Sequence, residues 1–282
     1  MHVYQCPLCR LPLSPGAGFW HCPQAHRFDC AREGYVNLLP VQFKRSKTPG
    51  DNQAMMRARR AFLDAGYYQP MRDAAMAMIT GLQTAAKARW LDIGCGEGYY
   101  TSALETALAG RGGDIQAYGL DIAKPAVRAA AKRYPRVRFC VASSQRLPFV
   151  DHGLDGVLRI YAPCNPAEVY RVLTPDGLLV TVAPGPRHLY QLKERIYSQV
   201  MLHPLRDEVL PGFTAAAERR LRFELVLPGT AAGELLLMTP FAWKATPEII
   251  TALTALPKFV CETDFILRAW RRDHGLASPA GR

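Results

Sequence analysis

A short glycine-rich loop constrains this chain more than any other feature. The loop, Gly94-Cys-Gly-Glu-Gly98, follows a short strand-like segment at 89–93 and precedes a segment with helical periodicity that starts at Tyr99. Three glycines at alternate positions let the backbone adopt dihedral angles that other residues avoid, and let it approach a ligand closely. A strand that enters such a loop and a helix that leaves it are typical of the ligand-binding edge of a parallel sheet.

Strand-like and helix-like segments alternate along the chain after this loop. Such alternation predicts a doubly wound α/β fold, in which helices cover both faces of a mostly parallel sheet. From the hydrophobic patterns, we expect strands at 89–93, 115–121, 137–141, 154–160, 178–183, 220–227, 234–238 and 260–268. We expect helices at 52–65, 68–84, 99–109, 124–134, 166–173 and 247–256.

Acidic residues stand at the ends of the first two strands of this alternation. Asp92 precedes the glycine loop, and Asp121 ends the next strand. The carboxyl ends of parallel strands meet at one edge of the sheet, where open α/β sheets bind their ligands. A carboxylate beside the loop disfavours a phosphate and favours an ammonium or a sulfonium. The methionine half of S-adenosylmethionine carries both cationic groups, so we expect this cofactor rather than a dinucleotide.

Each strand end has a distinct expected role in holding the cofactor. Asp121 can accept hydrogen bonds from both ribose hydroxyls. Ser143 follows the third strand, where the edge of the adenine is expected. The residues of the loop that we expect to surround the cofactor are Gly94, Cys95, Gly96 and Glu97.

A metal-binding pattern occupies the first 40 residues. Two residues between paired cysteines let a tight turn direct both thiolates at one ion, and a second, facing turn completes a tetrahedron. So short a segment cannot bury a stabilising core alone, which favours a structural zinc site in a small N-terminal domain. Four protein ligands leave no open position for catalysis. The predicted ligands are Cys6, Cys9, Cys22 and His26.

Two nearby residues offer alternative ligands. His21 adjoins the third ligand, and Cys30 lies four residues beyond the fourth. Neither has better spacing, so we interpret Cys30 as a packed thiol. The start of the chain shows no signal-peptide pattern. We therefore expect a cytoplasmic protein whose eight cysteines are thiols or metal ligands rather than disulfides.

The charge of the chain favours a polyanionic partner. Lys and Arg outnumber Asp and Glu by 35 to 24, a net charge of +11. A surplus of this size attracts nucleic acid, although a solvated basic surface without a partner is the alternative. Cations gather at 44–47 and 57–60. No stretch is apolar for the ~20 residues that a membrane span needs, so we expect no membrane partner.

The strand-end residues together resemble those of class I methyltransferases over about residues 85–185. This resemblance implies a Rossmann-like, seven-stranded doubly wound sheet, preceded here by the zinc-binding domain. Many enzymes of this class carry Asp at the position of Ser143, where this chain offers only a hydroxyl.

A closer resemblance covers nearly the whole chain. The zinc pattern is followed by Glu33-Gly-Tyr-Val-Asn-Leu-Leu39, Arg57-Ala-Arg-Arg-Ala-Phe-Leu63, the glycine loop and Pro184-Gly-Pro-Arg-His-Leu189. These segments are similar to those of the RlmA family of bacterial 23S rRNA (guanine-N1)-methyltransferases. The expected domains are a zinc module at 1–40 that helps to recognise RNA, a basic linker and helix at 41–67, and a methyltransferase domain at 68–282.

This resemblance implies a target and two further cofactor contacts. The target is a guanine in a hairpin of 23S rRNA, and we regard a homodimer as one assembly to test. Tyr68, which precedes Gln69-Pro70, is expected to cover the cofactor, and His188 to contact it. From the residues alone, we would interpret Tyr68 as a core aromatic and His188 as a hydrogen-bonding residue at a helix start.

Methyl transfer to a guanine ring nitrogen requires an acceptor for the proton on that nitrogen. The fourth strand ends at Arg159-Ile-Tyr-Ala-Pro-Cys164, which lacks the Asn/Asp-Pro-Pro-aromatic signature of exocyclic-amine methylation. Tyr161 is our candidate catalytic residue, to stack on the base or relay a proton, with plain packing as the alternative. Phe241 and Trp243 are candidates for a base pocket and equally good core residues.

Two other functions remain open at this point: a zinc-containing methyltransferase that acts on another RNA or on a small molecule, and a nonenzymatic RNA-binding protein. The basic stretch at 44–60 counts against a small-molecule substrate. The intact glycine loop, Asp92 and Asp121 count against a nonenzymatic protein that has lost its catalytic activity. We also expect that a chain without residues 1–40 still folds and binds cofactor but no longer methylates RNA.

Overall fold

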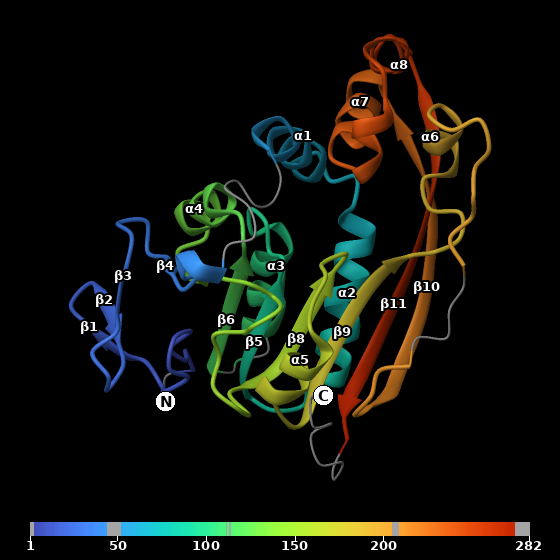
Figure 1. Cartoon of the computed structure of the whole chain (residues 1–282). Coiled ribbons are helices and arrows are strands. Elements are labelled where there is room, and N and C mark those ends of the chain that lie inside the picture. Colours follow the sequence, from blue (N-terminus) through green and yellow to red (C-terminus); the bar gives the residue numbers. More distant parts are fainter. Residues whose placement is uncertain (1–2, 44–51, 111, 113, 205–208, 274–282) are drawn as a thin grey trace.

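A computed structural model describes residues 3–43, 52–110, 112, 114–204 and 209–273. The expected RNA-binding cations at 44–47 and most of the C-terminal tail lie outside these residues. Eight strands form the central sheet in the order β10-β11-β9-β8-β5-β6-β7-β4 (Figure 1). The strands are β4 (Val36–Asn37), β5 (Lys87–Ile93), β6 (Asp114–Asp121), β7 (Arg138–Val141), β8 (Leu154–Ile160), β9 (Leu173–Pro184), β10 (Phe213–Leu227) and β11 (Phe259–Arg272).

The topology of this sheet confirms the predicted fold class. β4 to β9 pair in parallel, and β11 and β10 close one side in antiparallel orientation. The strand order reverses at β5, because β6 lies on one side of it and β8 on the other. Ligands of open α/β sheets bind at such a reversal, beyond the carboxyl ends of the strands. Seven strands match the expectation, and β4 is an eighth that the N-terminal region adds.

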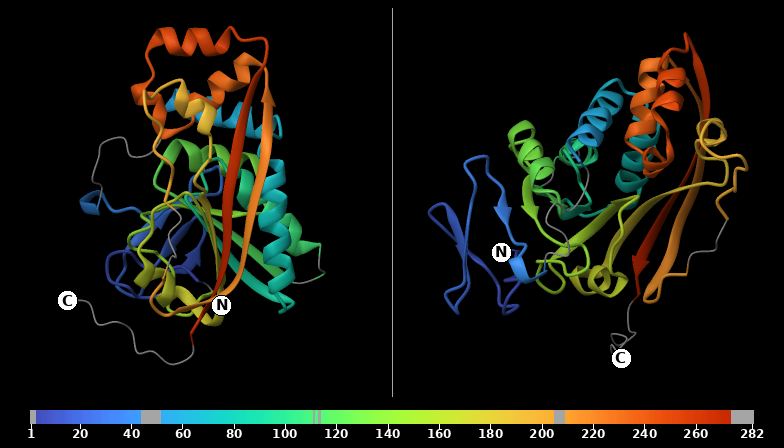
Figure 2. Two further views of the ribbon diagram at one scale, coloured as in Figure 1. Left: turned by 90° about the vertical axis from the view of Figure 1, so that its right-hand side faces the viewer. Right: turned by 45° about the horizontal axis from the view of Figure 1, so that its top comes forward.

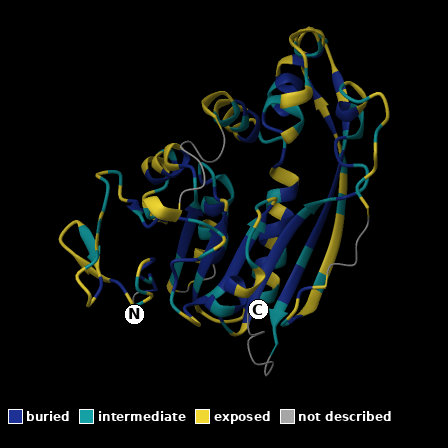
Figure 3. Cartoon of the chain, viewed as in Figure 1, coloured by how far each residue is buried: buried dark blue, intermediate teal, exposed yellow. Residues whose placement is uncertain are grey.

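Helices cover one face of the sheet almost completely. α2 (Gln69–Leu82) packs on β9 and β11, and α3 (Tyr99–Ala109) packs on β6 and α2. Both helices bury apolar residues in the cluster that contains Trp90, and α4 (Lys124–Arg133) packs on β6 and β7. Proline in the first turn of α2, α4 and α5 (Pro166–Val172) suits helix starts, where the missing N–H costs nothing. Figure 3 shows buried residues along the central strands of the sheet.

The zinc module covers part of the opposite face, beside α5. Its hairpin strands are β1 (Ser14–Gly16), β2 (Phe19–His21) and β3 (Arg27–Asp29), and its last strand, β4, pairs with β7. Tyr4 is fully buried, with ring centroids of Trp20, Tyr118 and Phe149 at 5.0, 5.7 and 5.3 Å. The connection between β7 and β8, residues 142–153, contains no helix. The module therefore covers a part of the sheet for which this crossover supplies no helix.

The zinc module and the sheet share one hydrophobic core. Val3, Tyr4, Leu13 and Leu38 belong to the same buried cluster as residues of β5, β6 and β8. Backbone bonds join the two parts as well: Val150 N donates to the Val3 carbonyl at 2.9 Å. Deletion of residues 1–40 would expose this cluster, so the expectation that the remaining chain folds alone loses its physical basis.

A long hairpin of β10 and β11 extends beyond the sheet and carries α7 (Gly229–Leu237), the 3-10 helix η2 (Pro240–Lys244) and α8 (Pro247–Thr254) (Figure 2). The strand predicted at 234–238 is wrong, because these residues end α7 and its turn. The run Leu235–Met238 suits a buried strand, but Ala231, Ala232, Leu235 and Leu236 are buried at helical spacing.

Three short or peripheral elements complete the description. α1 (Gln53–Asp64) packs on α7, α6 (Tyr190–Glu194) packs on β11, and η1 (Val41–Phe43) is a single 3-10 turn. α1 begins at a regular cap, where the Asn52 side chain accepts a hydrogen bond from Met55 N at 2.9 Å. Within the described part of the chain, no helix is both long and apolar enough to cross a membrane.

Candidate zinc cluster and cofactor-binding edge

The four predicted zinc ligands come together at the base of the N-terminal module. Their ligand atoms all lie within 4.8 Å of one another. The Cys22 sulfur is 3.3 Å from the Nδ1 of His26 and 3.6 Å from the sulfur of Cys9, and the Cys6 sulfur is 3.6 Å from His26 Nδ1. Zinc–sulfur bonds of about 2.3 Å place two sulfurs of a tetrahedron about 3.8 Å apart. The cluster therefore has the donor types and dimensions that zinc requires.

Two similar turns hold these ligands. Cys6 N donates to the Leu11 carbonyl at 2.8 Å, and Cys22 N donates to the His26 carbonyl at 3.1 Å. Each turn passes through a residue with positive φ, Arg10 at 63° and Ala25 at 60°. The alternative ligands His21 and Cys30 lie outside the cluster: His21 is exposed on β2, and Cys30 lies beyond β3.

The glycine loop crosses the carboxyl end of β5 and is fixed by the end of β6. Gly94 N and Cys95 N both donate to the Leu120 carbonyl, at 2.8 and 3.0 Å. A Cβ on Gly94, whose φ is +74°, would lie 2.6 Å from the Cβ of Ala162 in the loop after β8. This position therefore requires glycine for both its dihedral angle and its close neighbour.

Asp121 holds the glycine loop in place and also lies at the carboxyl edge of the sheet, where the cofactor is expected. One of its carboxylate oxygens accepts from Gly96 N at 2.9 Å and the other from Ala123 N at 2.8 Å. Each oxygen keeps a second lone pair that can accept from a ribose hydroxyl. The side chain is half-buried, which is compatible with both roles.

Asp92 lies beneath the loop, with only 2% of its surface exposed. Its carboxylate accepts a hydrogen bond of 2.6 Å from the Thr101 hydroxyl in α3. Burial, together with the negative charge of Asp121, raises the pKa of Asp92 to about 7, although the bond from Thr101 opposes this change. A nearby cation would favour the ionised form. The sequence analysis did not identify Thr101, which is a lone hydroxyl in a helix.

Glu97 points toward α1 and not only toward the loop. Arg60 of α1 forms a two-pronged ion pair with it, in which Arg60 Nε lies 2.7 Å from one Glu97 oxygen. Arg59 donates to the Met238 carbonyl at 3.1 Å after α7. Two of the cations predicted to bind RNA at 57–60 thus fasten α1 to the rest of the fold.

Ser143 begins a tight turn after β7. Its hydroxyl oxygen accepts from Gln145 N at 3.2 Å, so the hydroxyl proton remains available to a ligand. The same turn contacts the loop after β8, because Asn165 N donates to the Ser144 carbonyl at 3.3 Å. Arg146 places its guanidinium 4.9 Å from the ring centroid of Phe43 in η1.

His188 lies after β9 with 6% of its surface exposed. Its Nδ1 accepts a hydrogen bond from Asp264 N at 3.3 Å. Burial, with the positive charge of Lys193 and His203, lowers the pKa of His188 to about 3. A neutral imidazole whose Nδ1 accepts carries its proton on Nε2. His188 can therefore donate a hydrogen bond through Nε2, but it cannot accept a proton there.

Two tyrosines lie close to His188. Tyr68 is buried at the start of α2, with its ring centroid 5.2 Å from Phe265 and 6.4 Å from His188. Tyr161 follows β8 with φ of 56°, and 44% of its surface is exposed. Its ring lies 6.0 Å from His188. A non-glycine residue in the left-handed region is often held there by function.

Asp264 is a buried acid beside His188 that the sequence analysis did not single out. It is 1% exposed and accepts two bonds from Arg220, at 2.7 and 2.6 Å, and one from Arg187 N at 3.1 Å. Burial would raise the pKa of Asp264, but these donors and Arg222 lower it to about 2. Asp264 thereby positions the loop that carries His188. Two acids, Glu262 and Asp264, inside the largely apolar run of β11 were the available signal.

The two candidate base-pocket aromatics of η2 differ. Phe241 is half-buried, packs against the core, and lies 6.2 Å from the ring of Tyr197. Trp243 is 77% exposed, with the Lys244 ammonium 4.9 Å from its ring. Only Trp243 is free to stack on a ligand, whereas Phe241 behaves as a core residue.

Comparison with known families matches both parts of the chain. A zinc-ribbon model described as "RlmA, N-terminal" matches residues 4–47, and a model described as "Methyltransferase domain" matches residues 91–177. Among solved structures, the YcgJ protein of Bacillus subtilis is 19% identical and aligns with a TM-score of 0.45 over 72% of this chain and 100% of its own.

Two curated relatives extend over almost the full length. A Streptomyces fradiae protein named 23S rRNA (guanine(748)-N(1))-methyltransferase is 34% identical over 260 residues, 90% of each chain. A Micromonospora griseorubida protein, provisionally named 23S rRNA (guanine-N(1)-)-methyltransferase, is 34% identical over 273 residues, which cover 89% of this chain and 90% of its own.

Proposed function

Because this chain belongs to the RlmA family of 23S rRNA (guanine-N1)-methyltransferases, we propose that it methylates the N1 nitrogen of one guanine in a hairpin of 23S rRNA. It is an S-adenosylmethionine-dependent enzyme with a zinc ribbon. The observation that carries the proposal is the arrangement at one sheet edge. Residues from five consecutive strand ends converge there, and the ribbon is fixed to the same sheet.

The donor set of this edge fits the cofactor. Asp121 offers free lone pairs for ribose hydroxyls, Ser143 offers a hydroxyl proton, and Asp92 places a buried negative charge beneath the loop. Bound S-adenosylmethionine supplies an electrophilic methyl group on a sulfonium. We assign Tyr68 and His188 to the same site, His188 as a neutral N–H donor.

The target base needs a surface and a proton acceptor. We propose that Tyr161, exposed and held at positive φ, stacks on the guanine and keeps its N1 in line with the methyl group. His188 does not accept the N1 proton, because its Nδ1 already accepts a bond and its Nε2 carries the proton. Tyr161 and water stay candidates to receive or relay this proton.

The zinc ion has a structural role in this proposal. Cys6, Cys9, Cys22 and His26 fill all four positions of a tetrahedron and leave none for a substrate. We further propose that the protein acts in the cytoplasm, since the eight cysteines, all within the described residues, form no disulfide and three of them are proposed zinc ligands. A homodimer stays a prediction that light scattering at several concentrations tests.

Mass mapping of 23S rRNA from cells with and without the gene tests the function. We expect one guanine fragment to lose the mass of a methyl group in the deletion strain, and purified protein to restore it in vitro. Labelling of another RNA or of a small molecule, with no change in 23S rRNA, would support the first alternative. Cofactor and RNA binding without turnover would identify a nonenzymatic RNA-binding protein.

A further inference from the structure

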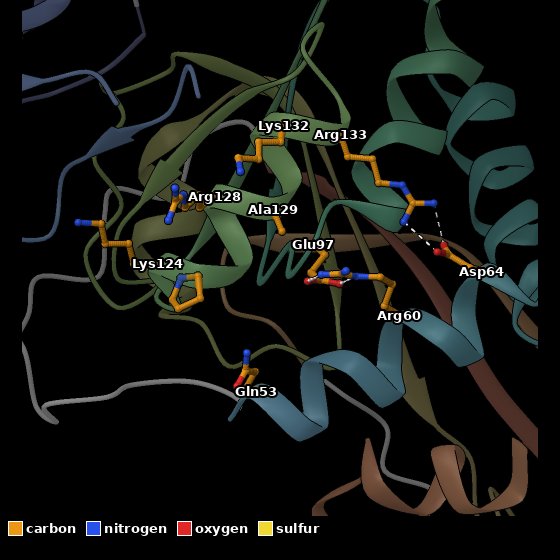
Figure 4. A pocket seen from close by; sticks show the side chains of 10 residues that line it. Gln53, Arg60, Asp64, Glu97, Lys124, Arg128, Ala129, Lys132 and Arg133 are labelled. Atoms are coloured by element: carbon orange, nitrogen blue, oxygen red, sulfur yellow. Dashed lines mark hydrogen bonds and ion pairs between the residues drawn. The ribbon is translucent and has the colours of Figure 1, made fainter. Parts of the chain in front are cut away.

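A hollow of about 970 Å³ lies between α1, α4 and the glycine loop (Figure 4). It is separate from the predicted cofactor contacts, except that Glu97 lies on its wall. Cationic side chains dominate the lining, and two carboxylates accompany them. The charged lining residues are Arg60, Asp64, Glu97, Lys124, Arg128, Lys132 and Arg133.

Both carboxylates of the lining are already neutralised. Glu97 pairs with Arg60, and Asp64 pairs with Arg133 at 2.9 and 3.1 Å. The other three cations all belong to α4. Their charge is not balanced by any acid of the lining itself, so the hollow presents a net positive surface to solvent.

The α4 cations form a row. Lys124, Arg128 and Lys132 are spaced four residues apart, which places them along one side of the helix over about 12 Å. Arg128 also pairs at 2.8 Å with Glu33 of the N-terminal module. Among the described residues, Lys124 and Lys132 have no ion pair or hydrogen bond through their ammonium groups. They are therefore available to an external anion.

We propose that this row, the α4 groove, binds consecutive backbone phosphates of the substrate RNA between the zinc ribbon and the cofactor loop. The proposal rests on the proposed function, and it adds a binding surface to it. A row of cations about 12 Å long matches a linear polyanion better than one small anion. Phosphate contacts of this kind give affinity and position, whereas base contacts give sequence preference.

The position of the groove supports RNA as its occupant. Arg128 connects it to the N-terminal module through Glu33, and Glu97 connects it to the glycine loop. A strand that contacts the ribbon and delivers a base to the carboxyl edge of the sheet can cross α4 on the way.

The double variant Lys124→Gln/Lys132→Gln tests the groove in the full-length, zinc-loaded protein. Neither ammonium group has an ion pair or hydrogen bond to another described residue, so we expect an unchanged thermal unfolding temperature. The matched control is Lys87→Gln/Lys258→Gln, which removes the same charge from two exposed lysines distant from the groove. Binding to a 23S rRNA hairpin fragment is measured by filter retention at several salt concentrations, and cofactor affinity by calorimetry.

We expect the groove variant to bind the RNA between about tenfold and thirtyfold more weakly at about 0.15 M salt, from the loss of two phosphate contacts. The slope of log K against log salt should fall by about 1.5 to 2. Equal RNA affinity for the groove and control variants would overturn the proposal. Lost methylation with unchanged RNA affinity would also overturn it, because the two lysines would then act in a step other than RNA binding. Failure of the proposed function is distinguishable, since the unaltered protein would then not methylate the RNA at all.

Discussion

The zinc cluster and the cofactor-binding edge differ in how far apart their residues lie in the sequence. The zinc ligands lie within 20 residues of one another, from Cys6 to His26, and each half of the cluster is one tight turn. The residues of the edge extend from Asp92 to His188 and come together only because β5, β6, β7, β8 and β9 share a sheet.

The zinc ribbon depends more on the rest of the fold than the cofactor-binding edge does. The ribbon has local ligands, yet its apolar residues are buried against the sheet, at Tyr118 and Phe149 among others. At the edge, each side chain is held by its own strand end and by a few nearby bonds, as Asp121 is by Gly96 and Ala123. Damage to the ribbon should therefore spread into the sheet, whereas damage at the edge should stay local.

The largest expected effect is the loss of a buried zinc ligand. Cys22→Ser should release the metal, whose binding in small zinc domains is worth about 10–16 kcal/mol, and should lower the unfolding temperature of the whole chain. Zinc content by plasma mass spectrometry and thermal unfolding by circular dichroism measure both. The control Cys30→Ser, outside the cluster, should keep its zinc. An unchanged unfolding temperature without zinc would mean that the ribbon is independent of the sheet.

Tyr4→Ala should give the next largest effect. This side chain fills the junction between the ribbon and the sheet, so its truncation should cost about 3–5 kcal/mol of unfolding free energy. Phe19→Ala in the outer hairpin is the control, because Phe19 is only half-buried there and should cost much less. Urea unfolding measures the free energies, and hydrogen exchange of β7 shows whether the damage crosses the junction. Loss of protection confined to 4–30 would contradict a shared core.

Local patterns in the sequence were sufficient for the zinc ligands and for most of the sheet. The spacing of Cys6, Cys9, Cys22 and His26 predicted a cluster that the structure brings together. The fold class, with the ends of α3 and β8, also followed from hydrophobic periodicity. These features are set by neighbours in the chain.

Features that depend on distant partners were not predictable in this way. The core contact of Tyr4 with Phe149 joins residues far apart in the sequence, and Asp264 acts on His188 from another strand. The apolar run at 235–238 is compatible with a strand or a helix when the sequence is considered alone. In the structure it ends α7, which packs against α1 and α8. The roles of Tyr68, Tyr161 and the cofactor contacts stay predictions.

The third prediction tests whether damage at the edge stays local. Asp121→Asn removes the charge that accepts from Gly96 N, Ala123 N and the expected ribose hydroxyls. Hydrogen bonds to a charged group are worth about 1.5–3 kcal/mol, so cofactor affinity should fall about tenfold to hundredfold. Asp114→Asn, at the exposed other end of β6, is the control and should bind normally. Calorimetric titration measures affinity, and an unfolded Asp121→Asn protein would identify a structural role instead.

A fourth prediction uses the raised pKa of Asp92. Without cofactor, the folded state holds this proton more tightly than the unfolded state, so stability should fall as the pH rises from about 4 to about 7. A cationic cofactor prefers the ionised carboxylate. Its affinity should therefore increase about tenfold between pH 6 and pH 8, with proton release near pH 7. Titration in buffers of different ionisation enthalpy measures the proton, and Asp92→Asn should remove the pH dependence.

The smallest expected effect concerns the protonation of His188, which we expect not to change with pH. Its pKa is lowered to about 3, first by burial and then by the charges of Lys193 and His203, so the imidazole should stay neutral throughout the range in which the enzyme works. Because Nδ1 accepts from Asp264 N, nitrogen-15 NMR should show the Nε2–H tautomer with no titration above pH 5. Arg220→Gln removes the ion pair between Arg220 and Asp264, so it should disturb the nitrogen-15 signal of His188. Arg219→Gln, a change at the neighbouring surface residue, should disturb this signal less. A His188 signal that titrates between pH 6 and 7 would contradict the fixed tautomer and restore this residue as a candidate acceptor for the guanine N1 proton. If the signal does not titrate, His188 contributes no acidic limb to the pH profile of methylation. The edge then binds and orients the base without a histidine that exchanges protons.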